Sequence, residues 1–142
     1  MSRWSPKPAP DDPDGLILFD GACVFCSRWV RFVIARDRAR RFTFVPIQSV
    51  RGRELAGRFG IDPDVPETNA VVLGGRIFFK SDAALTVLGA LPSTRPMAIL
   101  KFAPRAPRDL AYDLVARNRY RIFGRTEACM VPSAADRARF LG

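Results

Sequence analysis

The 142-residue chain has no histidine and only three cysteines, and each shortage argues against a class of protein. Without histidine, a closed zinc site needs cysteine or carboxylate ligands, and three cysteines leave the usual set of four incomplete. Three cysteines are also too few for the disulfide scaffold of a small secreted domain. No apolar run approaches the ~20 residues of a membrane span, and no signal-peptide segment opens the chain. We therefore expect a cytoplasmic protein without a membrane span.

Negative charge is also scarce, since 14 acidic residues face 23 basic ones and give a net charge of +9. Almost all of the positive charge comes from arginine. A basic balance can indicate a nucleic-acid partner, but the arginines are scattered and no nucleic-acid-binding motif is present. We interpret them as an ordinary solvated surface and do not expect a nucleic-acid partner.

The composition divides the chain into a tail and one domain. Residues 1–14 are rich in proline and aspartate, offer little to bury and predict a disordered N-terminal tail. Residues 15–142 are long enough for a single domain with a proper core, and 48% of the chain is hydrophobic. This domain includes a helical C-terminal extension from about residue 96.

The first half of the domain alternates strands and helices. The apolar run 16–19 is typical of a fully buried strand. From Cys26 onward, apolar residues recur at helical spacing, with arginines on the outer face. Residues 42–47 are aromatic and β-branched enough for a second strand, and 50–59 predict a helix that ends at Gly60.

The second half predicts a hairpin followed by helices. Gly74 and Gly75 can take positive φ angles in a two-residue turn between strands 70–73 and 76–80. Ser81 is a suitable N-cap for the next helix. Two further helices are predicted, over about 108–123 and 134–141. The order β-α-β-α-β-β-α predicts an α/β domain with a central mixed four-stranded sheet.

The residues best suited to carry out a reaction are Cys23 and Cys26, which lie where the first strand ends and the first helix begins. Unpaired backbone N–H groups and the helix dipole favour a thiolate there, so Cys23 is the expected nucleophile. Cys26 lies one turn further on, on the apolar stripe, and is the expected resolving thiol. Two intervening residues keep the sulfurs within bonding range, which predicts thiol-disulfide exchange through a mixed disulfide.

Several alternatives remain open around this pair. Asp20 could exchange a proton with Cys26, or it could only cap the helix or the loop. Cys129 could be an inert small residue or a third thiol. The thiols could also bind a metal, in a metal-binding or redox-sensing protein without turnover. A third class is a basic module that binds nucleic acid or a membrane surface through the arginine face of the first helix. We assign no cofactor and no metal ligands.

The run from Leu18 to Cys26, with Asp37 closing the following helix, resembles the DCC family of thiol-disulfide oxidoreductases. That family takes its name from the aspartate and the two cysteines. Other matching segments bring the resemblance to about residues 16–141: Ser81-Asp82-Ala83, Asn118 to Arg125, Cys129 and Pro132. The resemblance implies a thioredoxin-like three-layer fold, the Cys23 and Cys26 pair as redox centre, and a disulfide- or thiol-containing protein or small thiol as substrate.

Two regions have a more specific interpretation. Ordinary thioredoxins place a cis-proline directly before the third core strand to align the substrate backbone. Here Thr68 and Asn69 precede that strand and the nearest proline is Pro66, so we expect peptide recognition to differ. Near the C-terminus, one group of residues could line the active-site rim, but we favour a role in tying the C-terminal helix to the core: Asn118, Arg119, Tyr120 and Arg125.

Overall fold

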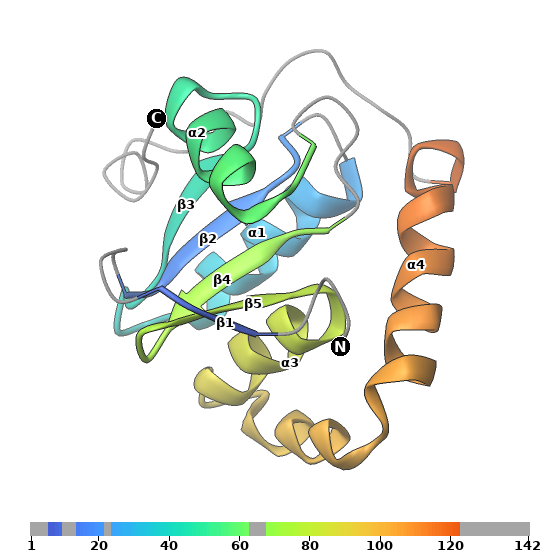
Figure 1. The fold of residues 1–142 in the computed structure, drawn as a ribbon. Helices are drawn as coiled ribbons and strands as arrows, with labels where there is room; N and C mark the ends of the chain where they lie inside the picture. Colours follow the sequence, from blue (N-terminus) through green and yellow to red (C-terminus); the bar gives the residue numbers. More distant parts are fainter. Residues whose placement is uncertain (1–5, 10–13, 22–23, 63–67, 123–142) are drawn as a thin grey trace.

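A computed structural model describes residues 6–9, 14–21, 24–62 and 68–122 (Figure 1). The strands are β1 Lys7–Pro8, β2 Leu16–Phe19, β3 Thr43–Pro46, β4 Ala70–Leu73 and β5 Arg76–Phe79. The helices are α1 Val24–Arg36, α2 Val50–Phe59, α3 Lys80–Ala90, the 3₁₀ helix η1 Arg95–Phe102 and α4 Arg105–Ile122. The described residues therefore form a mixed α/β structure around one five-stranded sheet.

The sheet has the strand order β1-β5-β4-β2-β3. β2 and β3 are parallel and joined by α1, as a βαβ crossover requires. β4 and β5 are antiparallel neighbours, and β4 also pairs antiparallel with β2. This arrangement places the apolar run of β2 in the interior of the sheet, where all four of its residues are buried.

Helices cover both faces of the sheet, and the alternation of side chains along β2 shows which helix covers which face. Leu16 and Leu18 belong to the core under α2, with Leu55 of that helix. Ile17 and Phe19 belong to the core on the other face. That core is completed by side chains of α1 and α3, including Val30, Val33, Ala83 and Val87. The result is a layer of α2, the sheet, and a layer of α1 and α3 (Figure 1).

Glycines at predicted turns have the backbone conformation expected of them. Gly74 and Gly75, with φ of 64° and 77°, connect β4 to β5. Gly60 ends α2 with φ of 81°, and its N–H bonds to carbonyls of the last turn. These positive angles suit glycine because it has no Cβ. The predicted hairpin and the predicted end of the second helix are confirmed.

The predicted strand count is wrong, because the sheet has five strands and not four. The additional strand, β1, comes from residues assigned to the disordered tail and pairs antiparallel with β5. Ala9, which follows it, is only 3% exposed. The physical reason is that the outer edge of β5 has unpaired backbone groups, which even two residues of a proline-rich segment can cover.

Helix α1 begins at Val24, as predicted for a helix that opens at the cysteine pair. Other helix boundaries differ from those predicted. Ser81 is not the N-cap of α3, because that helix begins at Lys80 with Phe79 at its N-cap and no side-chain cap bond. Helix α4 begins at Arg105 instead of near residue 108. The helix predicted over 134–141 lies outside the described residues.

The segment after α3 extends beside the layered core. The 3₁₀ helix η1, which was not predicted, connects α3 to α4, and Figure 1 shows α4 as a long helix standing beside the sheet. No helix among the described residues is both long and apolar enough to cross a membrane. The C-terminal extension therefore supplies a wall next to the core, and the candidate site lies against this wall.

Candidate functional site

The carboxyl ends of the parallel strands β2 and β3 bring Asp20 and Gln48 together. Asp20 follows β2 and is only 3% exposed. The Nε2 of Gln48 donates to Asp20 Oδ1 at 2.6 Å, and the backbone N–H of Gly21 donates to Gln48 Oε1 at 2.9 Å. Gln48 thus fixes the orientation of a buried carboxylate at the start of the loop that leads to α1.

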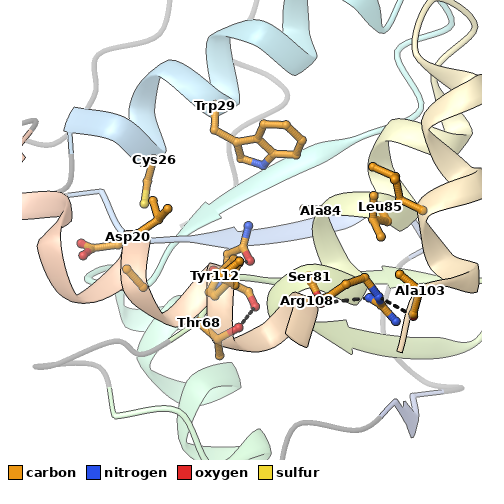
Figure 2. Close-up of a pocket in the computed structure, with 15 residues that line it drawn as sticks. Asp20, Cys26, Trp29, Thr68, Ser81, Ala84, Leu85, Ala103, Arg108 and Tyr112 are labelled. Atoms are coloured by element: carbon orange, nitrogen blue, oxygen red, sulfur yellow. Dashed lines mark hydrogen bonds between the residues drawn. The ribbon is translucent and has the colours of Figure 1, made fainter. Parts of the chain in front are cut away.

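Helix α1 contributes Cys26 and Trp29 to the same region. Cys26 lies in the first turn of the helix and is partly buried. Trp29 is one turn further on, and its ring stacks on Phe32 with centroids 5.8 Å apart. In Figure 2, both side chains project from the same side of α1, and the sulfur of Cys26 points toward Asp20. The apolar stripe predicted for this helix therefore includes the sulfur of Cys26 and the indole of Trp29.

Asp20, Cys26 and Trp29 line one cavity of about 470 Å³ (Figure 2). Its far wall is formed by small and aliphatic side chains of α3, η1 and α4: Ala84, Leu85, Leu100, Ala111, Val115 and Ala116. Polar groups are fewer and come mainly from the segment before β4 and from α4, namely Thr68, Asn69, Ser81, Arg108 and Tyr112. The site is a largely apolar cavity with a thiol and a carboxylate at one end.

Tyr112 of α4 holds the backbone that precedes β4. Its hydroxyl accepts from the N–H of Asn69 at 3.0 Å and donates to Asn69 Oδ1 at 2.9 Å. Thr68 Oγ1 donates to the Asn69 carbonyl at 2.6 Å and accepts from the N–H of Lys80 at 2.7 Å. Thr68 and Asn69, the two residues directly before β4, are therefore hydrogen-bonded to other groups of the protein.

Charged and polar pairs attach the first turn of α3 to α4. Asp82 is buried and forms ion pairs with Arg105, whose Nε lies 2.8 Å away, and with Arg108, whose terminal nitrogen lies 3.0 Å away. Ser81 Oγ bonds to Asp109 and accepts from Arg108. Two further groups, Lys80 Nζ and Asp113, pair at 2.6 Å. The segment Ser81-Asp82, recognised in the sequence as a signature, thus serves to hold the cavity wall.

Lys101 attaches η1 to α3. Its Nζ donates to Thr86 Oγ1 at 2.8 Å and lies 5.2 Å from the centroid of the Phe78 ring. Burial lowers the pKa of the Lys101 amine below its ordinary value, and the nearby charge of Asp82 partly offsets this effect. The amine that secures η1 therefore releases its proton more readily than a fully solvated lysine.

Some predicted residues lie outside the described part of the chain. These are Cys23, Pro66, Cys129 and Arg125, together with the side chains of Arg119 and Tyr120. Asn118 is described, and its Nδ2 donates to the carbonyl of Leu114 within α4 at 2.7 Å. Within the described ranges, no three histidine, cysteine or acidic side chains are grouped to hold a metal.

Sequence reasoning missed Gln48, Tyr112 and Trp29 as parts of this site. Gln48 and Tyr112 are separated from their partners by 28 and 43 residues, so no local pattern connects them. Trp29 falls within the helical spacing of apolar residues after Cys26, and that spacing does not predict a cavity beside the helix. One signal was available for Gln48, since residues that follow parallel strands meet at one edge of a sheet.

Comparison with known proteins provides relatives but no experimental structure. The profile of the DCC1-like thiol-disulfide oxidoreductase family matches residues 17–125. The uncharacterized protein YuxK of Bacillus subtilis is 35% identical over 130 residues, which cover 91% of this chain and 95% of YuxK. The chloroplastic DCC family protein At1g52590 of Arabidopsis thaliana is 38% identical over 121 residues, 84% of this chain and 70% of that protein. No solved structure matches significantly.

Proposed function

Because the chain belongs to the DCC1-like thiol-disulfide oxidoreductase family, we propose that it is an enzyme that exchanges disulfides through Cys23 and Cys26. The observation that carries this proposal is the position of Cys26. Its side chain lies in the first turn of α1 and lines a cavity together with the buried carboxylate of Asp20. A thiol beside both a helix N-terminus and a substrate-sized cavity is suited to exchange chemistry.

The reaction has two balanced steps. The Cys23 thiolate attacks one sulfur of a substrate disulfide R–S–S–R, forms the Cys23–S–S–R mixed disulfide and expels one R–S⁻, which takes up a proton. The Cys26 thiolate then attacks the sulfur of Cys23, forms the Cys23–Cys26 disulfide and expels the second R–S⁻. The protein loses two electrons and the substrate gains them. Run in reverse, the same steps oxidise a dithiol.

Asp20 is the proposed proton carrier for Cys26. A thiol must lose its proton before it can attack, and a carboxylate on the same cavity wall can accept that proton. The hydrogen bond from Gln48 holds Asp20 in one orientation, which supports a role in proton transfer. The same geometry supports a positioning role for Gln48, because it reaches the reacting atoms only through Asp20.

We extend this proposal to the fold, the substrate and the location of the protein. The layer of α2, the sheet and the layer of α1 and α3 support a thioredoxin-like fold, with β1 as an addition at the sheet edge. A disulfide- or thiol-containing protein or small thiol is the proposed substrate. The relative from Arabidopsis is named as chloroplastic, so family membership does not determine the cellular compartment. A cytoplasmic location of this protein stays a prediction.

The test is to trap the mixed disulfide in a background that carries Cys129→Ser. Reduced Cys26→Ser protein, mixed with a small disulfide, is expected to retain one substrate half on Cys23, because no resolving thiol can expel it. Cys23→Ser is expected to retain none, or far less, and the Cys129→Ser parent is expected to form the internal disulfide. Mass spectrometry of the intact protein distinguishes these products.

Two results would contradict the proposed exchange. One is that Cys23→Ser and Cys26→Ser react alike with the disulfide, so that the two thiols have no separate roles. The other is a tightly bound metal in the purified protein that masks both thiols at every redox poise. The second result would support the metal-binding or redox-sensing alternative without turnover.

A further inference from the structure

The cavity beside Cys26 has the size and lining of a small-molecule site. Its volume of about 470 Å³ falls within the ~300 to 1,000 Å³ typical of such sites. Small side chains such as Ala84 and Ala111 leave the space open, while Leu85 and Val115 make its walls apolar. An apolar group that leaves water for this cavity gains the free energy of hydrophobic burial.

The charges around the cavity disfavour an anionic occupant. Arg108 is the cationic side chain among the described lining residues; its Nε donates to the carbonyl of Ala103, and one terminal nitrogen donates to Asp82 and Ser81. Its charge is thus already paired with a buried carboxylate. At the other end, next to Cys26, stands the acidic side chain of Asp20. A neutral occupant therefore fits better than a carboxylate-bearing one.

Trp29 supplies an unused hydrogen-bond donor at this cavity. Its Nε1 is the one buried side-chain nitrogen or oxygen without a partner in the part of the chain that the structure describes. The nitrogen itself is covered, but the Trp29 side chain lines the cavity and is partly exposed. In Figure 2, the nitrogen lies on the ring edge that faces away from α1. Contact between this N–H and an acceptor in the cavity requires the ring to turn toward the cavity.

The backbone before β4 favours a compact group over an extended peptide. The Asn69 N–H already donates to Tyr112 of α4, so it is not available to a substrate backbone. Helix α4 itself stands over this segment, attached by the ion pairs of Asp82 and Lys80. A substrate group beside Cys26 therefore meets the apolar cavity and finds no free Asn69 N–H to pair with.

We propose that this cavity binds the organic group R of the disulfide substrate, and that R is neutral, compact, largely apolar and bears a carbonyl-type acceptor for Trp29 Nε1–H. This inference rests on the proposed disulfide exchange. The group R enters as part of R–S–S–R and leaves as R–SH in the two balanced steps given above. The cavity then selects the substrate, and the cysteines carry out the exchange.

Binding can be measured without any redox chemistry. Trp4 and Trp29 are the two tryptophans of the chain, so Trp4→Phe leaves a single indole N–H signal in a ¹H–¹⁵N NMR spectrum. Titration with acetanilide, which joins an aromatic ring to an amide carbonyl, is expected to move this signal downfield and to saturate. Propylbenzene, which has no acceptor, is expected to bind without the downfield shift and about tenfold more weakly.

Two matched variants locate the binding. Ala111 lines the cavity and is exposed, so Ala111→Trp fills the space without disturbing the core, and acetanilide affinity is expected to fall at least about tenfold. Ala106 is exposed on the same helix and does not line the cavity, so Ala106→Trp is expected to bind as the parent does. Val115→Trp is the second cavity-filling variant if Ala111→Trp fails to fold. An absent or non-saturating shift, or equal binding by filled and parent proteins, overturns the proposal.

The substrate preference is tested with two disulfides. Bis(phenylacetyl)cystamine is neutral, aromatic and amide-bearing, whereas glutathione disulfide is anionic; the first is expected to oxidise the reduced protein at least about tenfold faster. The net charge of +9 would favour the reverse order, which makes the comparison discriminating. Equal rates, or faster reaction of glutathione disulfide, overturn this inference and leave the exchange function intact. Saturable acetanilide binding without oxidation by either disulfide instead shows that the proposed exchange has failed.

Discussion

Two buried aspartates flank helix α1, and their partners assign them different roles. Asp20, before the helix, accepts from the side chain of Gln48. Asp37, after the helix, accepts from the backbone N–H groups of Arg41 and Phe42 at 3.1 and 2.9 Å. Backbone donors of a buried turn need an acceptor, which Asp37 provides. The aspartate at the end of the signature is therefore structural, and the one at its start is the candidate for chemistry.

These roles predict opposite effects of two substitutions. Asp20→Asn keeps an acceptor for Gln48 but cannot take a proton, so we expect the mixed disulfide on Cys23 to resolve about 10²-fold more slowly, with stability almost unchanged. Asp37→Ala leaves a buried N–H without its acceptor and is expected to cost about 2 kcal/mol of unfolding free energy. The rates come from quenched mass spectrometry and the stabilities from urea unfolding. If Asp37→Ala slows resolution in the folded protein as much as Asp20→Asn does, the assignment is wrong.

In helix α2, two glycines five residues apart have different constraints. Ser49 caps this helix, since its Oγ accepts from the N–H of Gly52 at 3.0 Å and donates to the carbonyl of Pro46 at 2.8 Å. The turn presses Gly52 against β3, where an added Cβ would lie 1.9 Å from the Pro46 oxygen. Gly57, on the exposed side, has open space around it.

Alanine substitutions at these two glycines form a matched pair. Gly52→Ala must displace the strand backbone, so we expect a loss of about 3 kcal/mol or more in unfolding free energy. Gly57→Ala is expected to add about 0.5 to 1 kcal/mol, because alanine has the higher helix propensity and no clash arises. Urea unfolding monitored by circular dichroism measures both. A Gly52→Ala protein as stable as wild type would contradict the close approach of α2 to β3.

At the scale of the whole molecule, the cavity depends on α4, which is held to the core through polar contacts. Its outward residues Leu110 and Leu114 are more than half exposed, so little apolar burial is available there to keep the helix in place. Asp82 instead forms ion pairs with two arginines, one from the first turn of α4 and one from the next. Removal of this buried carboxylate leaves both arginines without their shared partner.

We therefore predict that Asp82→Ala loosens α4 while the sheet stays intact. Amide hydrogen exchange in α4 is expected to accelerate at least about tenfold, whereas the amides of β2 and β4 keep their protection. Glu54→Ala, an exposed acidic change on α2, is the control and is expected to alter neither. Hydrogen-exchange mass spectrometry resolves the two regions. Unchanged exchange in α4 would mean that other contacts hold the cavity wall.

Elements whose signals are local could be predicted from the sequence alone. The apolar run of β2, the glycine pair of the hairpin, the helical spacing after Cys26 and the stop at Gly60 each act over a few residues, and each recurs in the structure. The family follows from the same kind of signal, because the cysteine motif and its flanking segments are short and contiguous. Periodicity and turn chemistry are readable without knowing which distant segments meet.

The distant residues that share a site are brought together by the packing of the fold. The pairing of β1 with β5, the bond between Gln48 and Asp20, and the attachment of α4 through Asp82 and Tyr112 join segments far apart in the chain. Polar side chains give no periodic signal, and a hydrogen bond across 28 or 43 residues depends on where the strands and helices come to lie. The cavity is the space left between such segments, so it exists only once they have packed.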